Sequence, residues 1–243
     1  MISGTDRDKL GRFAGDCVRA LGADLLRAVL LHDAVDGGSV AGKATFATVV
    51  IVQEVSPQLL RQVAELARRW RRSGIATPLV LDDEDLARSC DVFPLEILAL
   101  MDCHVLLWGA RDPLGGLRLD HEQLRLEVEQ QLKGKVLHLR QAYLECTGDK
   151  RAVRTLLLDS SAGFEAILRG LLMLAGRERS ADPEDLTREV ERVLGVKLAT
   201  FRTIQAARQG RGSVAPGESE ARFARYLEEL TGLSRIADRI TRP

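Results

Sequence analysis

The sequence predicts an α/β domain followed by an all-α helical bundle. Up to about residue 110, short runs rich in Val, Ile and Thr alternate with stretches whose apolar residues have helical spacing. After "RDPLGGL" (111–117) the β-branched runs stop, and helical spacing continues toward the end of the chain. With 243 residues, of which 45% are hydrophobic, the chain can build two small cores. We therefore expect domains over residues 1–112 and 118–243.

The first predicted helix covers residues 5–22, because its apolar residues recur every three or four positions and share one face. They are Leu10, Phe13, Ala14, Cys17, Val18 and Leu21. The apolar run "LLRAVLL" (25–31) and the β-branched run "FATVVIV" (46–52) then predict two buried strands, one on each side of a glycine-rich loop.

The segment 56–74 is predicted to be an amphipathic helix with both ends marked. Ser56 is a suitable N-cap, Pro57 fits the first turn, and Gly74 can end the helix. The first domain is completed by a predicted strand, a short helix and further strand, over 76–82, 82–90 and 93–109.

The second domain begins with a long predicted helix over 120–146, with Asp120 as its cap. The segment 149–176 has the pattern of a second continuous helix, so apolar that we expect it at the centre of the bundle. Three more helices are predicted, over about 183–194, 197–209 and 218–240.

Composition excludes several classes of function. The chain has 35 basic and 35 acidic residues, so it lacks the basic surplus that is typical of nucleic-acid-binding proteins. No apolar run reaches the roughly 20 residues needed to span a bilayer, and the N-terminal "MISGTDRDKLGRF" is not signal-like. The four cysteines include no C-x-x-C pair, which favours reduced thiols over a disulfide framework or a zinc site. These features predict a cytoplasmic protein that binds neither membranes nor nucleic acid.

The glycine-rich loop lies in "LLHDAVDGGSVAGKATFATVVIV" (30–52) and invites a phosphate-binding interpretation. Gly37, Gly42 and Lys43 match G-x-x-x-x-G-K, but Ala44 follows where a P-loop has Ser or Thr. A P-loop must also open a helix, whereas "ATFATVVIV" has the composition of a strand. The loop is therefore expected to connect two strands of a hairpin.

The order helix, strand, glycine-containing turn, strand, helix, strand, followed by a helical bundle, resembles the DNA polymerase β-type nucleotidyltransferase superfamily. The chain is most similar to small bacterial nucleotidyltransferase-domain proteins with a C-terminal helical domain. The resemblance is closest in the loop segment, in "GIATPLVLDDEDLARSCDVFPLEILAL" and in "LRLEVEQQLKGKVLHLRQAYL". It implies a nucleotidyltransferase-like α/β domain with a mixed sheet.

Active members of this superfamily have a Gly-Ser pair after the first strand and two carboxylates, one residue apart, at the start of the second. The turn lets backbone N–H groups approach a triphosphate, and the carboxylates share a strand face, where they hold Mg²⁺. In this sequence the Gly-Ser positions fall on His32 and Asp33, and the carboxylate positions fall on Thr45 and Ala47. A third carboxylate, expected on a later strand, would fall near Glu96.

The resemblance therefore implies a catalytically degenerate protein with a binding or regulatory role. It would bind a nucleotide-like ligand or a protein partner in the cleft between its domains. The alternative is an active, Mg²⁺-dependent nucleotidyltransferase that uses displaced carboxylates, for which Asp33 and Glu96 are the catalytic candidates. No metal ligands are assigned otherwise. The residues expected at the nucleotide site are His32, Asp33, Gly37, Gly38, Ser39, Lys43, Thr45 and Ala47.

Two charged stretches lie outside this site. In the run "RRWRR" (68–72) we expect the arginines to surround the buried stripe of a helix and to form a solvated face. The alternative is a docking patch for an acidic partner. The helix 120–146 also carries mixed charge, which is either a solvated face or a set of ligand contacts. Its residues are Glu127, Glu129, Lys133, Lys135, His138 and Arg140.

Overall fold

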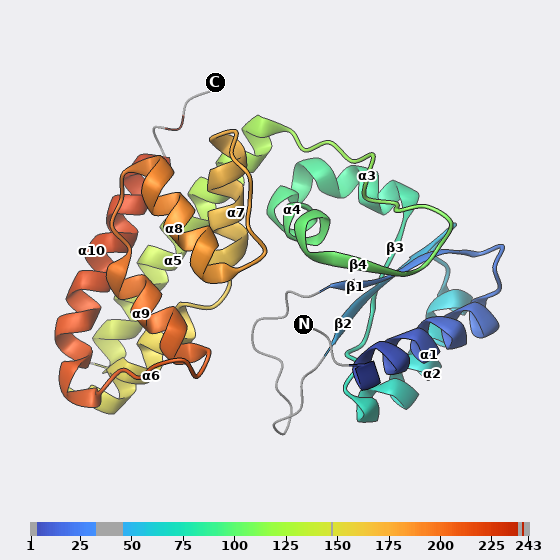
Figure 1. Ribbon diagram of the computed structural model, residues 1–243, viewed down its shortest axis with the longest axis horizontal. Helices are drawn as coiled ribbons and strands as arrows, with labels where there is room; N and C mark the ends of the chain where they lie inside the picture. Colours follow the sequence, from blue (N-terminus) through green and yellow to red (C-terminus); the bar gives the residue numbers. More distant parts are fainter. Residues whose placement is uncertain (1–3, 33–45, 147, 238–239, 241–243) are drawn as a thin grey trace. The chain divides into compact units, whose positions relative to one another are not determined.

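The computed structural model describes residues 4–32, 46–146, 148–237 and 240, and they divide into two compact units (Figure 1). The α/β unit comprises Met1–Phe93 and Ala99–Leu119, and the helical unit comprises Pro94–Leu98 and Asp120–Pro243. An α/β arrangement followed by helices was predicted, and the structure has it. The short segment Pro94–Leu98 belongs with the helical unit although it lies inside the range predicted for the first domain.

The described residues of the α/β unit form one mixed sheet of four strands. They are β1 (Leu26–His32), β2 (Ala47–Val52), β3 (Leu79–Asp82) and β4 (His104–Trp108). The strand order is β3-β2-β1-β4; β1 runs antiparallel to β2 and β4, and β2 runs parallel to β3. The central strands are buried on both faces, since Val29, Leu30, Val50 and Ile51 are all fully buried. This explains why both sequences are continuous apolar runs rather than alternating ones.

Helices α1 (Gly4–Leu21) and α2 (Pro57–Trp70) cover one face of this sheet, and Figure 1 shows α3 (Asp83–Val92) on the other. Helix α2 begins at the predicted cap but ends at Trp70, before the predicted Gly74. The Ser56 hydroxyl accepts a hydrogen bond from the Leu59 N–H at 3.2 Å. After a 3₁₀ turn, η1 (Arg71–Ser73), the chain reverses at Gly74, whose φ of 80° favours glycine.

The predicted strand over 93–109 is wrong for most of its length. Residues 94–103 form helix α4 (Pro94–Cys103), and only β4 is extended. Pro94 occupies the first helical turn, where its missing N–H costs nothing. Every apolar residue of "LEILAL" is buried and only Glu96 is exposed. One polar position in six is too few to separate a helical period from a strand period.

The described helical unit contains six helices besides the start of α4. They are α5 (His121–Cys146), α6 (Lys150–Ser160), α7 (Phe164–Leu174), α8 (Pro183–Leu194), α9 (Ala199–Arg208) and α10 (Ser219–Ala237), with a 3₁₀ turn, η2 (Pro216–Glu218), before α10. The predicted single helix over 149–176 is wrong, because the chain breaks at Gly163, where φ is 70°. The second piece, α7, is buried around most of its circumference, as expected for a central helix.

No helix within the described residues has the length and apolar character needed to cross a membrane. No disulfide joins the four cysteines, all of which lie in the described part of the chain.

Candidate functional site

The ends of β1 and β2 are the described part of the predicted nucleotide site. His32, the last residue of β1, lies opposite Ala47, the first residue of β2. Both are on the central strands of the sheet, and both are partly buried. The register therefore makes neighbours of two positions that are 15 residues apart in the sequence. The other residues assigned to this site, Asp33, Gly37, Gly38, Ser39, Lys43 and Thr45, lie outside the described residues.

A second histidine adjoins this strand end. His32 also lies opposite His104, the first residue of β4. The His104 ring is held at both nitrogens: Nδ1 is 3.0 Å from the Leu100 carbonyl oxygen, and Nε2 is 3.1 Å from Asp112 Oδ2. The two contacts fix the orientation of the ring beside the end of β1. The sequence did not reveal this contact, because Asp112 follows β4 in an irregular segment.

A third carboxylate was expected on a strand, near Glu96, but Glu96 lies in a helix. It is an exposed residue in the first turn of α4, within the helical unit. Its neighbour is Glu127 of α5, whose Oε2 accepts a hydrogen bond from the Leu95 N–H at 2.9 Å. Burial, opposed by the hydrogen bond from the Leu95 N–H and aided by the charge and hydrogen bond of Glu96, raises the pKa of Glu127 to about 7. The two carboxyl groups therefore form a pair that holds a proton near neutral pH.

The helical unit contains a hollow of about 360 Å³. Its polar lining residues are Lys135 and His138 of α5 and Asp159 and Ser160 of α6. Its apolar lining residues are Leu139, Ala142, Leu156, Ala162, Phe164 and Leu230. This volume is at the lower end of those of small-molecule sites, roughly 300–1,000 Å³.

Lys135 is held in the hollow by two contacts. Its Nζ donates to the Ala162 carbonyl oxygen at 2.8 Å and lies 4.8 Å from the centre of the Phe164 ring. These contacts hold an ammonium group against the α6–α7 turn. A small molecule with an apolar body and an anionic group fits this combination, and Asp159 favours a hydrogen-bond donor on the same ligand.

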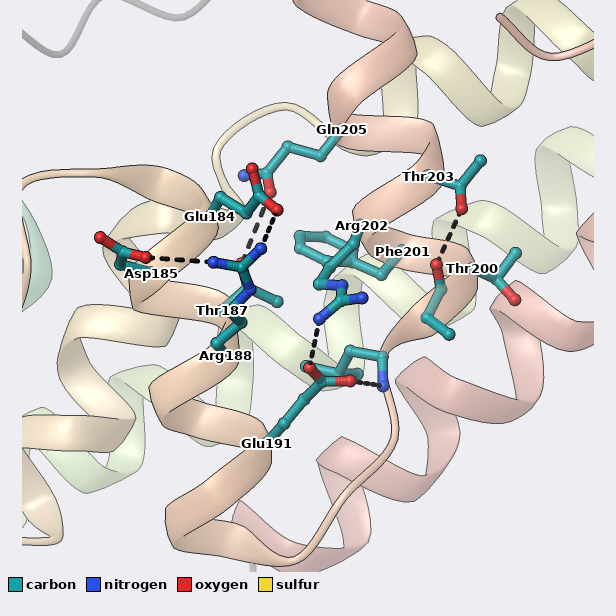
Figure 2. Close-up of polar contacts among 12 residues, drawn as sticks. Glu184, Asp185, Thr187, Arg188, Glu191, Thr200, Phe201, Arg202, Thr203 and Gln205 are labelled. Carbon is teal, nitrogen blue, oxygen red and sulfur yellow. Dashed lines mark hydrogen bonds and ion pairs between the residues drawn. The ribbon is translucent and has the colours of Figure 1, made fainter. Parts of the chain in front are cut away.

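The polar cluster between α8 and α9 has an internal explanation (Figure 2). Glu191 accepts the Leu198 N–H at 2.7 Å and pairs with Arg202 at 3.1 Å. Arg188 pairs with Glu184 at 2.5 Å and with Asp185 at 3.4 Å. Glu184, Asp185 and Glu191 thus have partners inside the cluster, and the cluster joins α8 to α9.

Within the described ranges, no three His, Cys, Asp or Glu side chains are grouped so that they could hold a metal ion. No protein-family model matches the chain, and no curated protein is similar enough to count as a match.

Proposed function

We propose that this chain is a nucleotidyltransferase-like protein that does not transfer nucleotides and acts by binding, either a nucleotide-like ligand or a protein partner. The order of its elements supports the proposal: α1, β1, β2, α2 and β3 precede a set of helices, as in the superfamily that the sequence resembles. The mixed sheet, with β1 antiparallel to β2 and β2 parallel to β3, agrees with the same interpretation.

The observation that carries the proposal is the chemistry of the β1–β2 pair. By the resemblance, Ala47 occupies a metal-ligand position, and His32 occupies the glycine position of the phosphate-binding turn. A methyl group cannot ligate Mg²⁺, which prefers near-octahedral oxygen coordination that includes one or two carboxylates. Without that metal, the charge of a triphosphate stays uncompensated, and electrostatic stabilisation is most of what this type of transfer requires.

Turnover assays test the proposal directly. Incubation with ATP, GTP, CTP or UTP and either Mg²⁺ or Mn²⁺ is expected to release no pyrophosphate and to leave no nucleotide on the protein. Metal-dependent turnover that disappears in Asp33→Asn or Glu96→Gln would overturn the proposal and support the displaced carboxylates. Calorimetry with the same nucleotides separates the two binding roles: an affinity without turnover indicates a nucleotide sensor, and no affinity indicates a protein-binding role.

A restored carboxylate pair tests the assignment of positions. The resemblance assigns Thr45 and Ala47 to the two carboxylate positions, so the double variant Thr45→Asp with Ala47→Asp is expected to gain measurable Mn²⁺ affinity. The control is Thr45→Asn with Ala47→Asn, which has nearly the same shape but no charge and should gain none. Equal Mn²⁺ affinity in both variants would contradict the assignment. Transfer activity need not return, because His32 and Asp33 still replace the Gly-Ser turn.

The hollow of the helical unit offers a place for a small ligand. If a nucleotide-like ligand binds there, His138→Gln and Asp159→Asn will change its affinity, while Ala47→Asn will not. If the β1–β2 end binds it, the opposite pattern is expected. Both sets of positions are exposed or partly exposed, so the variants should remain folded.

A further inference from the structure

The outward face of α2 carries an excess of arginine. Between Pro57 and Ser73 there are five arginines and one other charged residue, Glu65. Arg61, Glu65, Arg68 and Arg72 are three or four positions apart and so follow one another along the face opposite the buried stripe. Arg69 and Arg71 flank this row. All six side chains belong to exposed residues.

Most of these arginines lack the ion pairs that helical arginines form elsewhere in the described chain. Arg125 pairs with Glu122 and Glu129, and Arg222 pairs with Glu218, in each case about one turn away. Within the described residues, by contrast, Arg61, Arg68, Arg71 and Arg72 form no ion pair. Arg69 reaches Asp16 of α1 at 3.5 Å.

The helix dipole does not account for the whole row. One or two basic residues in the last turn offset the negative helix end, and Arg68 and Arg69 suffice for that. Arg61 lies near the other end, and Arg71 and Arg72 add like charges a turn from their neighbours. Like charges at this spacing destabilise a helix. An external anion would relieve this repulsion.

The arginines also surround a recess. A surface hollow of about 540 Å³ is lined by Glu65, Arg68, Arg69, Arg71 and Arg72. A guanidinium group binds a carboxylate through two parallel hydrogen bonds, so several of them around one recess favour a partner with several anionic groups.

The face favours a protein partner over a nucleic acid. Trp70, the aromatic residue of α2, is turned inward: its Nε1 donates to Asp16 at 3.0 Å, and its ring packs edge-on against Phe13. It is therefore not presented for stacking on a base. Glu65 sits in the middle of the row, where a phosphate backbone offers only repulsion. A protein segment can place a donor opposite Glu65 and an apolar side chain on Leu60, which is 44% exposed.

We propose that the outward face of α2, Arg61–Arg72, docks an acidic helical segment of a partner protein. Carboxylates four residues apart on such a segment match the one-turn spacing of Arg68 and Arg72, and a carboxylate two turns further along matches Arg61, seven positions before Arg68. They would bind by charge-assisted hydrogen bonds. None of these residues belongs to the β1–β2 end, so the proposal names a surface for the protein-binding role but does not depend on the absence of nucleotide transfer.

The test measures binding of a fluorescent 20-residue helical peptide with Glu residues four apart, and of the same peptide with Gln in place of Glu. The intact chain is expected to bind the Glu peptide, to bind it more weakly as salt rises, and not to bind the Gln peptide. Arg68→Glu with Arg72→Glu should lower the affinity at least tenfold. The matched control, Arg140→Glu with Arg225→Glu, makes the same charge change on exposed positions of the helical unit and should retain binding.

Circular dichroism verifies that both double variants are folded. Equal binding of the Glu peptide by the two double variants would overturn the proposal, as would no binding by the intact chain. Tighter binding of a single-stranded RNA of equal charge, lost in Arg68→Glu with Arg72→Glu, would overturn it in favour of a nucleic acid. Self-association abolished by the same variant would overturn it in favour of a second copy, through the acidic first turn of α3 (Asp83, Glu84 and Asp85).

Discussion

Glu127 couples the stability of the helical unit to pH. Its carboxyl group is buried, and Glu96 lies beside it. Burial, with the help of Glu96, raises the pKa of Glu127 from 4.5 to about 7. Between these values the folded protein keeps a proton that the unfolded chain has released. The stabilisation from this group is therefore fully present below pH 4.5 and is lost as the pH rises through about 7.

Glu127→Gln should flatten this pH dependence. The amide keeps an oxygen that can accept the Leu95 N–H but cannot ionise beside Glu96. From pH 5 to pH 8, the thermal unfolding midpoint of the unaltered chain is expected to fall more than that of the variant. Glu145→Gln, at an exposed position of the same helix, serves as the control and should follow the unaltered chain. Parallel curves for all three proteins would show that Glu127 does not hold its proton.

At the scale of elements, α7 packs closely enough to require a glycine. A Cβ added to Gly170 would lie 2.6 Å from Leu95 Cδ2 and 2.6 Å from Val128 Cγ2. Helices α5 and α7 and the first turn of α4 therefore approach one another at this position. A methyl group there forces two buried side chains to move.

Gly170→Ala is therefore expected to destabilise the chain by about 1–3 kcal/mol, because overpacking outweighs the better helix propensity of alanine. Gly134 of α5 gives the matched control, since nothing lies within 4 Å of its added Cβ. Gly134→Ala should stabilise the chain by about 1 kcal/mol through helix propensity alone. Urea unfolding measures both, and a stabilising Gly170→Ala would contradict the close approach.

Leu168 tests the central position of α7. Its side chain is fully buried, so Leu168→Ala should destabilise the chain by about 2–5 kcal/mol through lost burial and the cavity left behind. Leu144→Ala removes the same atoms from a residue that is 77% exposed and should cost less than about 0.5 kcal/mol. If the two losses of unfolding free energy were similar, α7 would not be the core of its unit.

At the scale of the whole molecule, the two compact units are not contiguous in sequence. Pro94–Leu98 belongs to the helical unit, where Leu95 lies close to the Gly170 position and its N–H binds Glu127. The helical unit therefore needs residues that precede it by more than 20 positions.

A fragment of residues 120–243 is expected to unfold at a lower temperature than the helical unit of the full chain. It lacks Leu95 and Leu98, which are buried, and leaves Glu127 without the Leu95 N–H. Circular dichroism follows the transition, and an added peptide of residues 93–103 should raise the midpoint where a scrambled peptide does not. A fragment as stable as the full chain would show that Pro94–Leu98 contributes nothing.

The sequence by itself determined much of the local structure, because its signals act over a few residues. The stripe of α1, the Ser56 cap of α2, the Gly74 reversal beyond its end, and the start of α5 at Asp120 are all as predicted. Each depends on periodicity or on a side chain that binds a backbone group nearby.

Only the tertiary structure decided the features that depend on distant partners. Residues 94–98 are helical and pack with α5 and α7. A short run in which every residue but Glu96 is apolar and buried shows no clear period, so its form depends on its neighbours. The pairing of His32 with Ala47 and His104, and of Glu127 with Leu95 and Glu96, joins residues that no local pattern connects. Within the part of the chain that the structure describes, Arg69 finds an acidic partner in Asp16 while Arg61, Arg68, Arg71 and Arg72 find none, and this too depends on what the fold brings near them.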